Sequence, residues 1–200
     1  MKVVTEAKTK EEALEKALKD LKLNESDIFY KVEEIKGKLF KAGSVKITAT
    51  PKEDILEEMK SFIKELCNNM GIDVSFESNI RETQFNIKMF SDNNAILIGK
   101  GGRTMKSIET ITKQMIQTKY GVRVKLFLDV ENYNDKRIKQ LERLAINTAK
   151  EVRNTKVEVH LDNMNSYERR VIHNKLTDFK GVTTESEGEE PNRHIVIKPE

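Results

Sequence analysis

The 200-residue sequence has one cysteine, Cys67, no tryptophan and only three prolines. A single cysteine excludes a disulfide framework and a cysteine-rich metal site. The histidines His160, His173 and His194 lack the spacing of a zinc motif, so we expect no bound metal. No stretch approaches the ~18 apolar residues of a membrane span, and the N-terminus has no apolar signal-peptide core. These absences predict a soluble, cytoplasmic protein without a transmembrane segment.

The sequence also lacks a recognisable catalytic constellation. Cys67 falls on the apolar stripe of a predicted helix, where a buried structural residue is far more common than a nucleophile. Acidic pairs such as Glu57 and Glu58 suit solvent-exposed helix faces, and no metal-binding cluster of carboxylates stands out. We therefore expect no enzyme activity and no cofactor, with a nuclease as a distant alternative.

Basic residues are unevenly distributed along the chain. The formal net charge of +3 is by itself too small to indicate a polyanionic partner. Residues 99–125, however, contain only one acid, Glu109. The basic residues in this stretch are Lys100, Arg103, Lys106, Lys113, Lys119, Arg123 and Lys125.

Hydrophobic residues make up 37% of the chain and charged residues 34%, which favours several small α+β domains with thin cores. Apolar periodicity predicts a β-α-β-β unit over 1–50 and an α-β-β-α-α-β unit over 51–130. The third predicted unit, 131–200, begins with a long amphipathic helix and ends in strands.

Capping residues mark the predicted helix starts. Thr9 followed by Glu12, and Asn165 followed by Glu168, form capping-box patterns. Thr50 is expected to be the N-cap of the second helix, with Pro51 at its first position. Further expectations are a turn at Gly37 and Gly43, an acidic loop over 185–191, and inward-facing Ile111 and Leu144.

Three glycines lie within four residues, 99–102, between two predicted helices. Glycine allows close approach of a ligand to the backbone, and a helix start offers free amides and a positive dipole end. A P-loop is excluded because the spacing G-x-x-x-x-G-K-[ST] is absent. A dinucleotide fingerprint is excluded because Thr104 stands where the third glycine belongs.

The remaining pattern is G-x-x-G between two helices and before a strand, with basic neighbours. The run Ile98-Gly99-Lys100-Gly101-Gly102-Arg103 resembles the KH family of RNA-binding domains. The resemblance implies a loop that clamps the nucleic-acid backbone beside an apolar groove for bases, with Met105 also in the groove wall. The RNA-binding residues that we predict here are Ile96, Ile98, Gly99, Lys100, Gly101, Gly102, Arg103 and Lys106.

A second candidate site lies on the helix after Asn165. Arg169 and His173 are four residues apart and share one helix face. This stretch resembles the Arg-x-x-x-His (R-3-H) family, which binds single-stranded nucleic acid, and residues 186–194 are similar to that family's closing hairpin. Arginine can bind phosphate and stack on a base, and histidine can stack or donate. Arg170 and Arg193 are further candidates, although Arg193 could equally pair with the acidic loop.

The order of the three units is similar to that of the Jag family, also called KhpB or SpoIIIJ-associated proteins. The match begins with Lys2-Val3-Val4-Thr5-Glu6-Ala7-Lys8-Thr9 and continues with residues 36–44, which correspond to the family's glycine-rich loop.

The resemblance implies a bacterial, cytoplasmic regulator that binds single-stranded RNA, with single-stranded DNA as an alternative ligand, and that is linked to cell elongation and division. It also implies a second small KH protein and a membrane insertase as partners. A homo-oligomer is left open. The competing hypothesis is a protein–protein adaptor whose nucleic-acid contacts are incidental.

Overall fold

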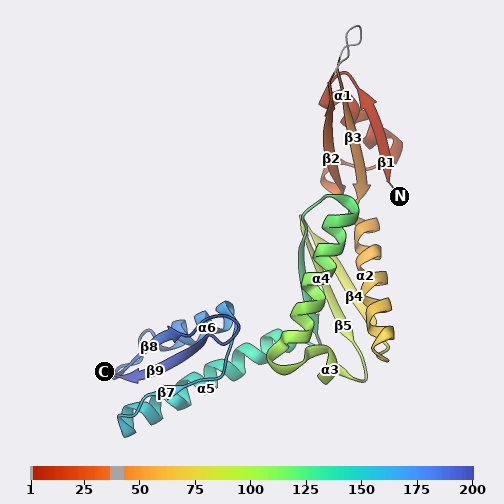
Figure 1. Ribbon diagram of the computed structural model, residues 1–200. Coiled ribbons are helices and arrows are strands. Elements are labelled where there is room, and N and C mark those ends of the chain that lie inside the picture. Colours follow the sequence, from red (N-terminus) through yellow and green to blue (C-terminus); the bar gives the residue numbers. More distant parts are fainter. Residues whose placement is uncertain (1, 37–42) are drawn as a thin grey trace. The chain divides into compact units, whose positions relative to one another are not determined.

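The computed structural model describes residues 2–36 and 43–200 (Figure 1). Its helices and sheets form a mixed α+β fold, as predicted. The chain divides into two compact units, residues 1–131 and 132–200. The finer division of the first unit at residue 50 stays a prediction. None of the helices in the described ranges has both the length and the apolar character needed to cross a bilayer.

The N-terminal part of the first unit is an antiparallel sheet of order β1-β3-β2, covered by one helix. The predicted cap at Thr9 is confirmed, since its hydroxyl accepts the amide of Glu12 at 3.2 Å. Its small core includes Ala13, Ala17 and Ile47. Gly37, predicted to lie in a turn, falls outside the described residues. The elements are β1 (Val3–Ala7), α1 (Lys10–Leu21), a 3₁₀ turn η1 (Glu25–Asp27), β2 (Ile28–Ile35) and β3 (Ser44–Pro51).

The second part of this unit has the predicted α-β-β-α-α-β order. Its sheet has the order β4-β5-β6, with β5 antiparallel to β4 and parallel to β6. Helices α2 and α4 lie side by side against this sheet (Figure 1). Alternate β5 residues Phe85, Ile87 and Met89 are buried, as expected of a strand with one covered face. The elements are α2 (Lys52–Asn69), β4 (Ser75–Arg81), β5 (Gln84–Phe90), α3 (Asn94–Ile98), a 3₁₀ turn η2 (Lys100–Gly102), α4 (Arg103–Tyr120) and β6 (Lys125–Val130).

Two details of the predicted helices are wrong. Thr50 is not a helix cap, because β3 extends to Pro51 and pairs there with Ile28; Pro51 itself precedes the first turn of α2. Ile111 does not face inward but is 49% exposed. Thr112 takes the buried position instead, and its hydroxyl donates to the Ile108 carbonyl at 2.7 Å.

Cys67 is fully buried on α2, as the apolar stripe predicts. Burial disfavours the thiolate and raises the pKa of this thiol. A protonated, inaccessible thiol is a poor nucleophile, so the position of Cys67 is that of a core residue.

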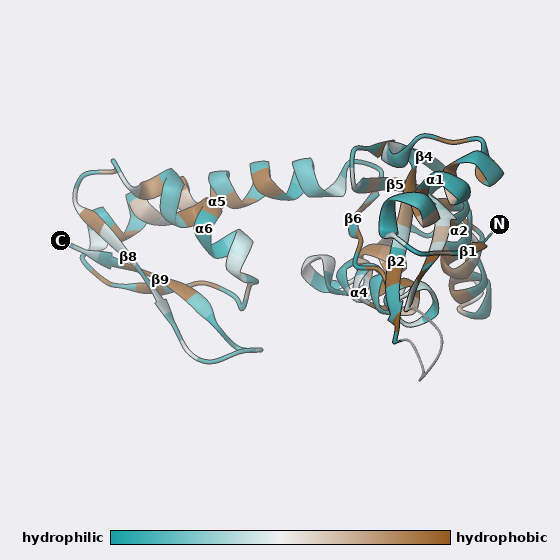
Figure 2. Cartoon of the chain, turned by 90° about the horizontal axis from the view of Figure 1, so that it is seen from above, coloured by the Kyte–Doolittle hydropathy of each residue, from teal (hydrophilic) through white to brown (hydrophobic). Residues whose placement is uncertain are grey.

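The second unit packs two helices against a sheet of order β7-β9-β8. Hydrophobic residues recur along α5 (Figure 2) and place Leu141, Ala145 and Ala149 in the core, whereas Leu144 is 43% exposed, contrary to prediction. The predicted acidic loop begins later than expected, because β8 extends to Glu187. The elements are α5 (Tyr133–Thr155), β7 (Val159–His160), α6 (Ser166–Leu176), β8 (Val182–Glu187) and β9 (His194–Pro199).

Candidate nucleic-acid interface

The glycine loop reverses the chain between α3 and α4. Gly99, Gly101 and Gly102 have φ angles of 70°, 60° and 78°, which non-glycine residues rarely adopt. A Cβ at Gly99 would collide with the Thr104 side chain and lie 3.0 Å from its backbone nitrogen. Glycine at position 99 is therefore required both by the backbone angle and by the close approach of Thr104.

The start of α4 is left without a side-chain cap. Its N-cap residue is Gly102, which has no side chain to accept a first-turn amide. The first turn also contains no acidic residue. The Gly102 and Arg103 amides donate to the Gly99 and Lys100 carbonyls, so what attracts an anion to this helix start is its positive dipole end, which no acid compensates.

The predicted basic residues around the loop differ in how they are paired. Lys100 and Arg103 are exposed, and neither has an ion pair within the described part of the chain. Lys106 instead contacts Glu109 at 2.6 Å, and Lys113 contacts the same carboxylate oxygen at 2.8 Å. The side chain of Glu109 is only 8% exposed. Lys100 and Arg103 are therefore the cations most available to a ligand.

Apolar side chains accompany these cations. Ile96 is 49% exposed and Ile98 is half-buried, whereas Met105 is buried beneath the helix. A shallow hollow runs along α4 beyond the loop. Its lining consists of Arg103, Lys106, Ser107, Thr110 and Ile111. The sequence missed this role for Ile111, because its helical spacing suggested a core residue.

Helix α6 begins with the predicted capping box. The Asn165 side chain accepts the amides of Tyr167 and Glu168 at 3.0 Å, and the Glu168 carboxylate accepts the Asn165 amide at 3.1 Å. The Glu168 carboxylate also accepts a hydrogen bond from Arg137 Nε at 2.8 Å. The backbone amides and the acid at this helix start therefore already have partners.

Arg169 lies beneath the surface rather than beside His173 in solvent. It is 8% exposed, and its Nη1 donates to the Met164 carbonyl at 2.7 Å and to Glu190 at 3.0 Å. Glu190 comes from the acidic loop between β8 and β9. Sequence periodicity could not find this partner, because the pairing depends on how the loop folds back.

His173, Arg170 and Arg193 are exposed. The His173 Nδ1 lies 2.7 Å from the Thr184 hydroxyl on β8, which orients the ring. Arg193 has no ion pair among residues 43–200, so the acidic loop is bridged by Arg169 and not by Arg193. Of the predicted residues here, Arg170 and Arg193 are therefore exposed cations, and His173 is an exposed ring.

Comparison with known proteins assigns both regions to nucleic-acid-binding domain families. The KH domain of KhpA and KhpB matches residues 56–128, and the R-3-H domain matches residues 139–199. The chain thus belongs to the class of proteins that combine a KH domain with an R-3-H domain.

Curated relatives then define the family. The RNA-binding protein KhpB of Clostridium symbiosum is 37% identical over 98% of this chain and 90% of its own length. KhpB of Bacillus subtilis strain 168 is 31% identical over 94% of this chain and 93% of its own. KhpB of Lactiplantibacillus plantarum is 34% identical over 72% of this chain and 43% of its own. The chain belongs to the KhpB family.

Proposed function

We propose that this protein is a non-enzymatic single-stranded RNA-binding protein whose main phosphate site is the glycine loop and the start of α4. The proposed contacts are the loop backbone at Gly99, Gly101 and Gly102 and the side chains of Lys100 and Arg103. Lys106 contributes less because Glu109 already holds its ammonium group. The names of the relatives, RNA-binding protein KhpB, support the same ligand class.

The observation that carries this proposal is the gathering of cations at the positive end of a helix. A cation near a helix N-terminus is unfavourable by about 0.3–1 kcal/mol, because the helix dipole repels it. Lys100 and Arg103 lie, despite this cost, at a helix start that has no cap and no acid. A phosphate group would interact favourably with the dipole end and with both side chains together.

The apolar residues beside the loop suit the bases of the same strand. Single-stranded RNA exposes base faces and edges that a duplex hides, so a binding site needs apolar surface next to its phosphate contacts. Ile96 and Ile111 are each about half exposed, and Ile98 is half-buried. We assign these side chains to the base-contacting surface.

Helix α6 supplies the second proposed contact. Arg170 and Arg193 are free to bind phosphate, and the oriented His173 ring can stack on a base. Arg169 positions this region through Met164 and Glu190, and it reaches RNA only when Glu190 releases it. Two modest sites on one chain raise overall affinity without new contacts when both engage one strand.

At the cellular level, the family resemblance supports a cytoplasmic post-transcriptional regulator linked to bacterial cell elongation and division. A second small KH protein and a membrane insertase are the partners that this resemblance suggests. Self-association is compatible with the same role.

The test is equilibrium binding of the full chain to an unstructured, fluorescein-labelled RNA oligonucleotide, measured by anisotropy from low to moderate salt. Affinity is expected to fall linearly with log salt, by about 0.7 log units per phosphate neutralised on a single strand. Lys100→Glu with Gly101→Asp should weaken binding by at least about 30-fold, equivalent to about 2 kcal/mol.

Lys64→Glu with Gly71→Asp is the matched control. It makes the same charge change at exposed positions, Lys64 on α2 and Gly71 just beyond its end, and Gly71 has a similar φ of 75° with open space for a side chain. The control should bind nearly as well as wild type. Salt-independent binding, or equal losses in the two double variants, would count against the glycine loop as the RNA site.

The adaptor hypothesis has one observation in its favour. Val4 and Ile35, on the strands of the N-terminal sheet, are 53% and 42% exposed. Binding of a protein partner to this apolar surface would depend little on salt. Val4→Lys in the full chain would abolish capture of that partner and leave RNA binding unchanged. Retained capture by Val4→Lys would remove this support for an adaptor.

A further inference from the structure

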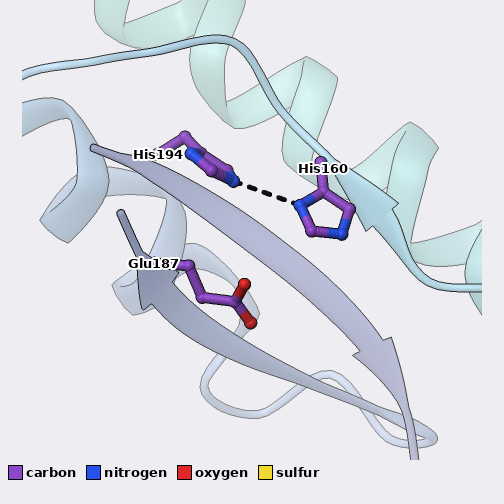
Figure 3. Close-up of side chains that lie close together, drawn as sticks. All are labelled: His160, Glu187 and His194. Carbon is purple, nitrogen blue, oxygen red and sulfur yellow. Dashed lines mark hydrogen bonds between the residues drawn. The ribbon is translucent and has the colours of Figure 1, made fainter. Parts of the chain in front are cut away.

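Two histidines and a glutamate converge on the outer face of the β7-β9-β8 sheet. In the strand register, Glu187 lies directly opposite His194, and His160 lies opposite Val196, two residues further along β9. All three side chains therefore share the face opposite the core residues Ile195 and Ile197. One ligand atom from each lies within 4.8 Å of the other two, as Figure 3 illustrates.

The two imidazole rings point toward each other with a short nitrogen–nitrogen separation. His160 Nδ1 and His194 Nε2 are 3.1 Å apart (Figure 3). These two facing nitrogens are the inner ones, and the other nitrogen of each ring is the outer one. Both outer nitrogens face acceptors: His194 Nδ1 lies 3.1 Å from the Asn192 carbonyl, and His160 Nε2 lies 3.4 Å from the Glu158 carboxylate. The tautomers that carry a proton on each outer nitrogen let both rings donate to these acceptors, and they leave lone pairs on both inner nitrogens.

Two lone pairs facing each other require a cation between them. A proton can fill this role, and so can a metal ion. Two ligands about 2.0–2.1 Å from a tetrahedral zinc ion are separated by about 3.3 Å, close to the 3.1 Å found here. Donation of the outer N–H to a carboxylate or a carbonyl is also the arrangement that orients histidine ligands in metal sites.

The third ligand is anionic and has an alternative partner. The Lys198 ammonium lies 2.7 Å from Glu187 and 2.6 Å from Glu185. Lys198 can remain with Glu185 when Glu187 turns toward an ion.

We propose that His160 Nδ1, His194 Nε2 and the Glu187 carboxylate bind one divalent transition-metal ion of the zinc type. Imidazole with carboxylate suits this class of ion, and three protein ligands leave a coordination position for water. The sequence spacing had predicted no metal, because the ligands come together only through strand pairing.

An ion at this site would also affect the loop between β8 and β9. Glu187 and His194 flank the acidic loop, which the structure places at residues 188–193 and which contains Glu190, the partner of Arg169. An ion at this position would join both ends of the loop to β7. The metal site thus goes beyond RNA binding and can be tested without RNA.

The experiment is isothermal titration of the chelator-treated full chain with zinc chloride, in parallel with thermal unfolding with and without zinc. Wild type is expected to bind one ion per chain and to unfold at a higher temperature with zinc, because ligand binding stabilises the folded state. His160→Ala and His194→Ala should each weaken zinc binding at least about tenfold and lose the thermal shift. Cobalt(II) should give visible absorption bands that disappear in both variants.

Two further variants distinguish a built site from nonspecific binding by histidine. His173→Ala removes the remaining histidine and should leave zinc affinity unchanged. Glu158→Gln keeps all three ligands but weakens the outer acceptor of His160, so affinity should fall about tenfold. Absence of saturable zinc binding in wild type, or zinc binding by His160→Ala and His194→Ala as tight as wild type, would overturn the proposal and leave a shared proton between the rings.

Discussion

At the start of α4, Lys100 and Arg103 face solvent without an ion pair in the described part of the chain, and the helix has no side-chain cap. At the start of α6, a complete capping box is present, and Arg169 is buried against Met164 and Glu190. The first region has exposed cations at a helix start without an acid, whereas the capping amides and the buried arginine of the second region already have partners. On the proposed function, we therefore expect the glycine loop to supply most of the phosphate binding and α6 to add a smaller contribution.

The largest expected effect comes from matched charge reversals in the two regions. Lys100→Glu with Arg103→Glu should weaken RNA binding about 100-fold, or about 2.7 kcal/mol. Arg170→Glu with Arg193→Glu makes the same charge change beside α6 and should cost about tenfold or less. Anisotropy titrations at one fixed salt concentration measure both. Equal losses, or a larger loss at α6, would break the comparison.

Stability should show the opposite order. Arg169→Ala removes the donor to Met164 and Glu190 and should destabilise residues 132–200 by about 2 kcal/mol. Arg143→Ala, at an exposed position on α5, and Lys100→Ala, in the glycine loop, should each change stability by less than about 0.5 kcal/mol. Denaturant unfolding followed by circular dichroism measures all three. An unaltered midpoint for Arg169→Ala would show that its buried contacts are not important for folding.

The geometry of the glycine loop can be tested separately from its charge. Gly99→Ala forces a side chain against Thr104 and into a backbone conformation, φ 70° and ψ 179°, that is nearly restricted to glycine; the backbone strain alone costs about 1–3 kcal/mol. Gly71→Ala also places a side chain at positive φ but in open space, so it is the control for a substitution without a collision. Gly99→Ala should unfold at a lower denaturant concentration than Gly71→Ala. Identical unfolding curves would show that the loop adapts.

The smallest predicted effect is a gain in RNA affinity. Glu190→Gln removes a negative charge from the acidic loop and weakens the ion pair that holds Arg169, so RNA affinity should rise about twofold at low salt. Because the Glu190 side chain is 63% exposed, salt should screen most of this gain. Anisotropy at two salt concentrations measures it. A loss of affinity would mean that Glu190 positions Arg169 for RNA rather than competing with RNA for it.

Local features could be predicted from the sequence. The cap at Thr9, the capping box at Asn165 and the glycine loop each depend on residues within a few positions of one another. Helical spacing placed most of the core correctly but could not tell that Thr112, rather than Ile111, would be buried. That outcome depends on how α4 rests on its sheet.

Contacts between distant segments could not be predicted. Arg169 meets Glu190 only because the loop after β8 folds back, and His160 meets His194 only because β7 pairs with β9. The histidine contact depends on the strand register and the arginine contact on the path of the loop, and residue spacing within one element reveals neither. The loop and the helix that carry the candidate residues were therefore predictable, whereas the burial of Arg169 against Glu190 was not.

The most direct test of the central claim is the salt dependence of RNA binding by wild type and by Lys100→Ala with Arg103→Ala. If these two side chains each neutralise one phosphate, the slope of log affinity against log salt should become shallower by about 1.4. Lys16→Ala with Lys64→Ala, at exposed positions on α1 and α2, should leave the slope unchanged. A wild-type slope in Lys100→Ala with Arg103→Ala would contradict phosphate binding at the start of α4.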